Sequence, residues 1–168
     1  ATDTLGNVFL GGHSNTGSPY TMSLVLKYDS LGEFKWANTL IAEGNVYGRG
    51  ISTDPGGNIY STGETNASIA GQSFGADLGY FVAKYDPNGN FAWVRQMDGT
   101  LGSTTVAYGV AADNLGNAYV TGYTTGALSG LTAESASDFF LAKYDTDGGF
   151  QWVRQRGRGS RASSITID

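Results

Sequence analysis

The chain has 168 residues, a formal net charge of −5, 26 glycines and no cysteine. The absence of cysteine excludes disulfides and thiolate metal sites. The acidic balance argues against nucleic acid as a partner, because its phosphates call for many Lys and Arg side chains. No stretch approaches the roughly 20 apolar residues of a membrane-spanning helix, so we expect no membrane insertion. High glycine with many Thr, Tyr and Val residues indicates an all-β protein with many turns.

Short strands and tight turns alternate from the N-terminus onward. Residues 1–3 are predicted to be the end of a first type of strand, expected complete at 50–54, 109–113 and 164–168. The aspartate at the end of this strand opens a tight turn, in which glycine supplies the positive φ. A second type of strand follows each turn and is expected at 8–12, 59–63 and 118–122.

Long polar loops then lead to a hairpin that carries the most regular sequence unit of the chain. The loops are expected at 13–22, 64–78 and 123–137, and the third type of strand at 23–28, 80–85 and 139–144. The unit itself reads Lys-Tyr-Asp-x-x-Gly followed by Phe-x-Trp, and occurs at 27–36, 84–93 and 143–152. A fourth strand holds the Phe-x-Trp pair, and further loops at 40–48, 97–107 and 156–163 lead to the next first strand. A fixed period of about 60 residues is typical of repeat architectures.

Each repeat is therefore predicted to be a four-stranded antiparallel meander, as in a β-propeller blade. Both tight turns of every repeat fall on one face of the expected disc, and both long loops fall on the other. Loops carried by a rigid scaffold commonly hold the functional residues of a protein. We therefore expect function on the loop face.

The residues that define the repeat also carry a family resemblance. The run Val-Ala-Ala-Asp-Asn-Leu-Gly-Asn-Ala-Tyr-Val-Thr-Gly at 110–122, followed by Phe-Leu-Ala-Lys-Tyr-Asp at 140–145 and by Trp152, resembles the bacterial SBBP-type β-propeller repeat. Residues 51–94 resemble it too, and the first copy resembles it more loosely. The resemblance implies a propeller, usually in secreted or cell-surface bacterial proteins, and it implies no catalytic residues. We therefore expect an extracellular or cell-surface location.

The expected fold is an all-β propeller of three four-stranded antiparallel blades with circularly offset ends. It forms a single domain over 1–168, with repeats at approximately 1–50, 51–109 and 110–168. Known propellers have four or more blades, so the expected partners are the remaining blades of a longer protein or a second copy that completes a six-bladed ring. We favour the segment of a longer propeller.

Side chains near the long loops form the weak candidates for ligand binding: Glu64, Asp77, Tyr80, Tyr123 and Asp138. Carboxylates and tyrosines that converge on one face could bind a sugar or a cation, and paired carboxylates could act as acid and base on a glycan. Their positions do not match from copy to copy, since Asp138 aligns with Gly79 and Met22. Ordinary solvation of the loops is the favoured interpretation.

Other conspicuous residues have structural interpretations that we prefer to functional ones. Asp29, Asp86 and Asp145 open tight turns; such an aspartate could bind calcium, but a turn that uses it for its own hydrogen bonds is the better interpretation. Trp36, Trp93 and Trp152 recur at one position, which favours packing between blades over a platform for sugars. His13 is interpreted as an exposed loop histidine. The arginines at 154, 156, 158 and 161 are interpreted as a solvated loop, with anion binding as the alternative.

The sequence thus favours a non-catalytic extracellular or cell-surface module for interaction or assembly, with no cofactor, no metal and no catalytic residue. Its partner could be another surface protein or a glycan. One alternative is a carbohydrate-active hydrolase or lyase that uses the loop carboxylates. The other is a purely structural repeat of a surface fibre or layer.

Overall fold

The computed structural model describes residues 1–15, 17, 19–72, 75, 78–157, 159 and 161–167. In this part of the chain eleven strands form three antiparallel sheets, and there is no helix, so none that could span a membrane. The strands are β1 (Val8–Ser14), β2 (Met22–Tyr28), β3 (Phe34–Leu40), β4 (Val46–Thr53), β5 (Ile59–Thr65), β6 (Gly79–Tyr85), β7 (Phe91–Met97), β8 (Thr105–Ala112), β9 (Ala118–Thr124), β10 (Asp138–Tyr144) and β11 (Phe150–Gly157). The predicted all-β class is confirmed.

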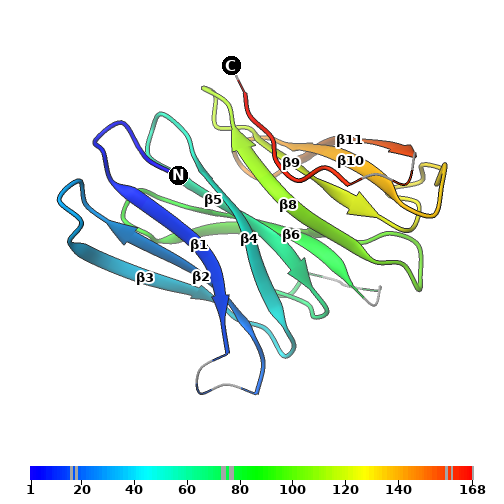
Figure 1. The fold of residues 1–168 in the computed structure, drawn as a ribbon, viewed down its shortest axis with the longest axis horizontal. Helices are drawn as coiled ribbons and strands as arrows, with labels where there is room; N and C mark the ends of the chain where they lie inside the picture. The colour runs from blue at the N-terminus through cyan, green and yellow to red at the C-terminus, as the bar shows by residue number, and fades with distance from the viewer. Residues whose placement is uncertain are drawn as a thin grey trace.

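The three sheets follow one another along the chain and correspond to three blades. Blade 1 has the order β1-β2-β3, blade 2 the order β4-β5-β6-β7, and blade 3 the order β8-β9-β10-β11. The sheets fan out from the side on which β1, β4 and β8 lie (Figure 1). Thr2 forms an antiparallel bridge with Val8, and Ala1 exchanges two main-chain hydrogen bonds with Phe9. Residues 1–3 are therefore the end of an inner strand, as expected.

The C-terminal segment differs from its prediction as a strand. Residues 161–167 form no strand, and Asp168 lies outside the described residues. The segment nevertheless passes along β8: a Cβ on Gly109 would lie 3.1 Å from the Cα of Ser164. A Cβ on Gly50 would likewise lie 3.2 Å from the Cα of Gly109. Residues 161–167 thus lie beside β8 in the same way that β8 lies beside β4. The red trace in Figure 1 agrees with this placement.

The strands are longer and the loops shorter than predicted. The inner strands β4 and β8 begin at Val46 and Thr105, inside the segments expected as loops. The pairing register shifts between Gly48 and Gly50 and between Ala107 and Gly109. Each shift is a β-bulge, which adds a residue to one strand and lets pairing continue past it. The bulges leave Arg49 and Tyr108 without a directly opposite partner residue.

Two apolar cores lie between neighbouring blades. Blade 2 is buried on both faces, since every residue of β5 and β6 is buried. Towards blade 1 it presents Phe81 and Tyr85, which pack with Phe9 and Val25. Towards blade 3 it presents Tyr80, whose ring stacks on Phe140 with centroids 4.9 Å apart. The blades therefore hold together by burying large aromatic side chains, which bury 150–250 Å² each.

Buried tyrosines make the stability of this fold sensitive to alkaline pH. Burial raises the pKa of Tyr85 and of Tyr144 to about 12, from an ordinary value of 10.0. A tyrosine with a raised folded-state pKa stabilises the fold fully below pH 10, and this stability is lost as the pH rises through 12. Two units correspond to roughly 2–3 kcal/mol for each group.

We predict that the free energy of unfolding is constant with pH just below pH 10 and falls steeply between pH 10 and pH 12. Urea titrations across that range measure this slope. Tyr85→Phe should reduce the slope by about one proton, whereas Leu115→Ala, which removes an exposed side chain that cannot ionise, should leave it unchanged. An equal slope in both variants would contradict the assignment.

Candidate functional site

Tight turns and long loops separate onto opposite faces of the molecule. Each tight turn is closed by an aspartate whose Oδ1 accepts the main-chain N–H four residues later, and in every turn except that of Asp54 it also accepts the one two residues later, as Asp86 does from Asn88 at 2.9 Å and from Asn90 at 2.8 Å. Asp29 and Asp145 make the same two bonds in their own turns. These carboxylate oxygens are occupied by the turn itself, which is the arrangement expected of an Asx-type turn. No group of three or more His, Asp or Glu side chains suited to a metal ion occurs among the described residues.

One position near the loop face recurs in all three blades but carries a different residue each time. His13 in β1, Glu64 in β5 and Tyr123 in β9 each lie second from the end of their strand. All three were expected in loops and lie in strands instead, because the second strands run two residues further than predicted. Equivalent positions of a propeller blade point in equivalent directions, so these side chains lie around the inner part of the loop face.

Arg49 binds the buried carboxylate of Glu64. Its Nε donates to Glu64 Oε1 at 3.1 Å and to Oε2 at 2.9 Å, and its Nη2 donates to Oε1 as well. The Glu64 side chain is 6% exposed and the Arg49 side chain 40% exposed. The carboxylate hydrogen bond raises the pKa of Arg49 above its ordinary value. A planar guanidinium suits this fork-like pairing.

A row of aromatic rings and guanidinium groups continues from Arg49 along the inner strands. The Arg49 guanidinium lies 5.9 Å from the ring centroid of Tyr108, and the rings of Tyr108 and Tyr123 are stacked 6.0 Å apart. The Arg161 guanidinium lies 4.3 Å from the centroid of Tyr123. Distances of this kind are typical of cation–π contacts. We call Arg49, Tyr108, Tyr123 and Arg161 the inner row.

The inner row is partly open to solvent. Tyr108 and Tyr123 are half-buried, while Arg49 and Arg161 are exposed. Beside the row, the ring of His13 meets that of Tyr47 edge-on at 5.2 Å. The row therefore combines fixed aromatic faces with cationic groups on a rigid scaffold of inner strands.

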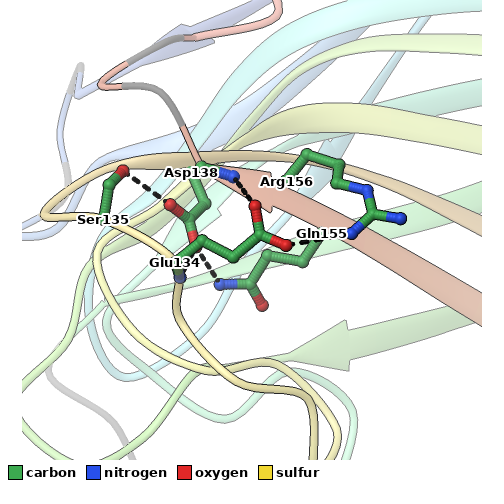
Figure 2. Close-up of polar contacts among 6 residues, drawn as sticks. Glu134, Ser135, Asp138, Gln155 and Arg156 are labelled. Carbon is green, nitrogen blue, oxygen red and sulfur yellow. Dashed lines mark hydrogen bonds and ion pairs between the residues drawn. The ribbon is translucent and has the colours of Figure 1, made fainter.

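Asp138, another candidate from the sequence, is fully buried and organises its own loop (Figure 2). Its carboxylate accepts hydrogen bonds from Ser135 Oγ at 2.7 Å, from the main-chain N–H of Glu134 at 2.8 Å and from Gln155 Nε2 at 2.8 Å. Burial opposes its charge, but these donors outweigh burial and hold the pKa of Asp138 below its ordinary value. The side chain is satisfied within the loop and is not presented to a ligand.

Glu134 holds the same loop to the outer strand. Its carboxylate accepts from Arg156 Nη1 and from the main-chain N–H of Gly157, both at 2.9 Å (Figure 2). The bond from Gly157 and the pairing with Arg156 hold the pKa of Glu134 below its ordinary value. Arg156 is thus engaged with its own loop. Arg158, also singled out from the sequence, lies outside the described residues.

The remaining candidates do not gather into one site. Tyr80 is fully buried between blades 2 and 3, where its hydroxyl lies 2.8 Å from that of Tyr144. Asp77 lies outside the described residues. Trp93 lies between blades, Trp36 packs against the same core as Phe9, and Trp152 lies on the outward face of blade 3. Of the five weak candidates, only Glu64 and Tyr123 lie at the inner row.

Several residues of this region were not singled out from the sequence. Arg49 and Tyr108 were missed because the bulges that carry them fall at the edges of segments expected as loops. Gln96 and Gln155 were also missed, although each fixes a long loop: Gln96 accepts from Ile69 N–H at 2.7 Å, and Gln155 from Leu128 N–H at 3.0 Å. The repeated run Trp-Val-Arg-Gln at 93–96 and 152–155 was the available signal.

Two segments of the chain, residues 32–70 and 92–128, match the family model described as the SBBP beta-propeller repeat. They cover β3 to β5 and most of β7 to β9, so each joins the outer strand of one blade to the inner strands of the next. The chain is also similar to an uncharacterised WD repeat-containing protein of Acanthamoeba polyphaga mimivirus, with 30% identity over 148 residues. That similarity covers 79% of this chain and 10% of the viral protein, so the chain spans about a tenth of this relative. The chain thus contains β-propeller repeats. The resemblance implied a bacterial origin, but this relative is viral and does not support that origin.

The pairing of Arg49 with Glu64 gives a testable contribution to stability. Arg49→Met would leave a buried carboxylate without its cationic partner, and we expect a loss of roughly 1–3 kcal/mol in the free energy of unfolding. Because Arg49 is partly exposed, the loss should fall below that for a fully buried pair. Urea titration at neutral pH measures it.

The matched control is Arg156→Met, which breaks the exposed pair with Glu134. The two side chains of that pair are 73% and 43% exposed, so its removal should lower the free energy of unfolding much less than Arg49→Met does. Adding Glu64→Gln to Arg49→Met should restore most of the lost stability. Equal losses for the two arginine variants would contradict the argument.

Proposed function

We propose that this chain is a non-catalytic protein-interaction module that acts outside the cell or on its surface and contacts its partner through the inner row. The observation that carries the proposal is the solvent-accessible alignment of Arg49, Tyr108 and Tyr123, on strands β4, β8 and β9, with Arg161 of the C-terminal segment. Tyrosine and arginine are enriched where proteins bind one another, because they combine large contact area with polar groups at low entropic cost.

Burial of the candidate carboxylates supports a binding function over a glycosidase. Acid–base chemistry on a glycan needs two carboxyl groups facing the same bond. Glu64 is bound by Arg49, and Asp138 is enclosed by Ser135 and Gln155. Both residues are buried, at 5% and 0% exposure, so neither carboxylate is offered to a substrate.

The extracellular or cell-surface location is supported by the resemblance to SBBP-type repeats. The absence of cysteine is compatible with an oxidising compartment, although a reducing one would accept the same composition. The printed name of the viral relative describes WD repeats and no partner. We therefore propose a protein as the partner and do not specify which one.

The test begins with selection of binding proteins from a library of displayed extracellular domains, followed by titration of each purified binder. A double variant, Tyr108→Ala with Tyr123→Ala, should weaken the binding by at least about tenfold, because it removes the two aromatic faces of the row. Leu115→Ala is the matched control, since Leu115 is 79% exposed on the tight-turn face. It should leave the affinity unchanged.

Binding that persists in the double variant and falls in the Leu115 variant would place the partner on the opposite face and overturn the proposal. Turnover of a glycan panel by the unchanged chain would overturn its non-catalytic part. Circular dichroism of each variant checks that the blades remain folded.

A further inference from the structure

The tight turn of each following blade is clasped by the blade before it. Lys84 Nζ and Trp93 Nε1 of blade 2 both donate to the carbonyl oxygen of Thr146 in blade 3, at 3.0 Å and 3.1 Å. Arg95 Nη2 donates to the next carbonyl oxygen, that of Asp147, at 3.1 Å. Three side chains from one face of blade 2 thus bind two consecutive carbonyl groups of a turn in blade 3. We call such a set of three donors a clasp, and the turn that it binds its seat.

Blade 1 holds blade 2 through the same positions, although Asn38 replaces the arginine and donates to the carbonyl oxygen of Gly89. Lys27 Nζ donates to the carbonyl oxygen of Pro87 at 3.0 Å, the position equivalent to Thr146. The Trp36 ring covers Gly89 so closely that a Cβ there would lie 2.9 Å from the ring. The same Cβ on Gly148 would lie 2.8 Å from the Trp93 ring. Glycine is thus required at this turn position both by its positive φ and by the ring above it.

Blade 3 carries the same clasp on its outward face, where the structure describes no further blade. Lys143, Trp152 and Arg154 occupy the positions of Lys84, Trp93 and Arg95. The Arg154 guanidinium lies 5.4 Å from the Trp152 ring centroid, close to the 5.6 Å between Arg95 and Trp93. The arrangement is thus already in place on the open face.

Apolar surface is exposed beside this outward clasp. Phe139 is 37% exposed, whereas Tyr80, at the equivalent position of blade 2, is fully buried. Lys143 and Trp152 are half-buried, whereas Lys84 and Trp93 are 8% exposed. The side chains that contact a neighbouring blade in blade 2 are therefore more exposed in blade 3 and available for a similar contact.

Blade 1 carries the matching seat on the opposite end of the array. Its turn runs from Asp29 to Glu33, with Gly32 at φ +81°, and in the described part of the chain nothing lies within 4 Å of a Cβ placed there. On the same face Val8 is 37% exposed and Leu10 50% exposed. Ala118 and Val120, at the equivalent positions of blade 3, are fully buried.

We propose that a second copy of this chain docks head to tail, with its blade 1 on the outward face of blade 3. In this arrangement Trp152 covers Gly32 of the copy, Lys143 donates to the carbonyl oxygen of Ser30, and Arg154 donates to that of Leu31. Phe139 packs against the face of blade 1 that carries the half-buried Leu24. The proposal does not rest on the function of the inner row, which lies on another part of the molecule.

A second copy is the chosen occupant because each chain carries both halves of the contact. A heterologous interface of this kind forms a ring when its rotation closes. Two chains would then give six blades, with each clasp and each seat used once. Residues 164–167 of one chain would take the position that residues 1–3 hold beside β1 in the copy, so residues 1–3 would have to move aside. The turn at Gly32, the exposed Val8 and Leu10 side chains, and the donors that bind no neighbouring turn in the described part of the chain would all be buried in one step.

The test is the molar mass of the chain in solution, measured by multi-angle light scattering over a concentration series. We expect twice the mass of one chain at tens of micromolar. Trp152→Ala should raise the dissociation constant at least about tenfold. Gly32→Asn should do the same by filling the seat, because asparagine tolerates a positive φ.

The matched control is Gly102→Asn, at a glycine with φ +80° and open space around its Cβ. It should leave the dissociation constant unchanged. Circular dichroism and urea titration identify any variant that fails to fold. A monomer at all concentrations, or association that is insensitive to both the Trp152 and Gly32 variants, would overturn the proposal.

Cross-linking provides a second readout that needs no loss of stability. The chain has no cysteine, so Lys143→Cys and Ser30→Cys each introduce a single thiol. A short bis-maleimide should join the two variants in an equimolar mixture and leave each variant alone largely uncoupled. Equal coupling within each variant alone would overturn the head-to-tail arrangement.

Discussion

The hydrogen bonds from one blade to the tight turn of the next are the constraint on which this structure depends. A blade has two apolar faces and cannot bury both by itself, so its stability comes from its neighbours. Apolar contact alone does not fix the rotation between two sheets. The lysine and tryptophan donors do fix it, because Lys84 and Trp93 must both reach the carbonyl oxygen of Thr146.

The aspartate of each turn makes this contact possible. Its carboxylate satisfies the N–H groups of the turn, as Asp145 does for Asp147 and Gly149. The carbonyl groups of the turn are then free to point outward, toward the preceding blade. The Lys-Tyr-Asp run therefore carries two roles two residues apart: the lysine binds the turn of the following blade, and the aspartate orders the turn that the preceding blade binds.

The sequence was a good guide wherever a residue has the same role in every copy. The turn aspartates, the Phe-x-Trp pairs and the glycines recur, so the strand types and both faces could be predicted. It failed where the copies differ. His13, Glu64 and Tyr123 share one position but differ in charge and shape, and Arg49 and Tyr108 sit in bulges, which have no pattern of alternation to reveal them. Their proximity depends on the stacking of blades, which local periodicity does not encode.

Repeated and varied positions have different structural roles. Residues that clasp the next blade cannot change without loosening the array, because a donor and its carbonyl partner lie in different repeats. His13, Glu64 and Tyr123 share one strand position but differ from copy to copy, so each can change alone. Arg49 illustrates the limit of that freedom, since its guanidinium both lies against Tyr108 and balances the buried charge of Glu64. This surface can therefore change while the turns, the tryptophans and the order of the blades stay the same.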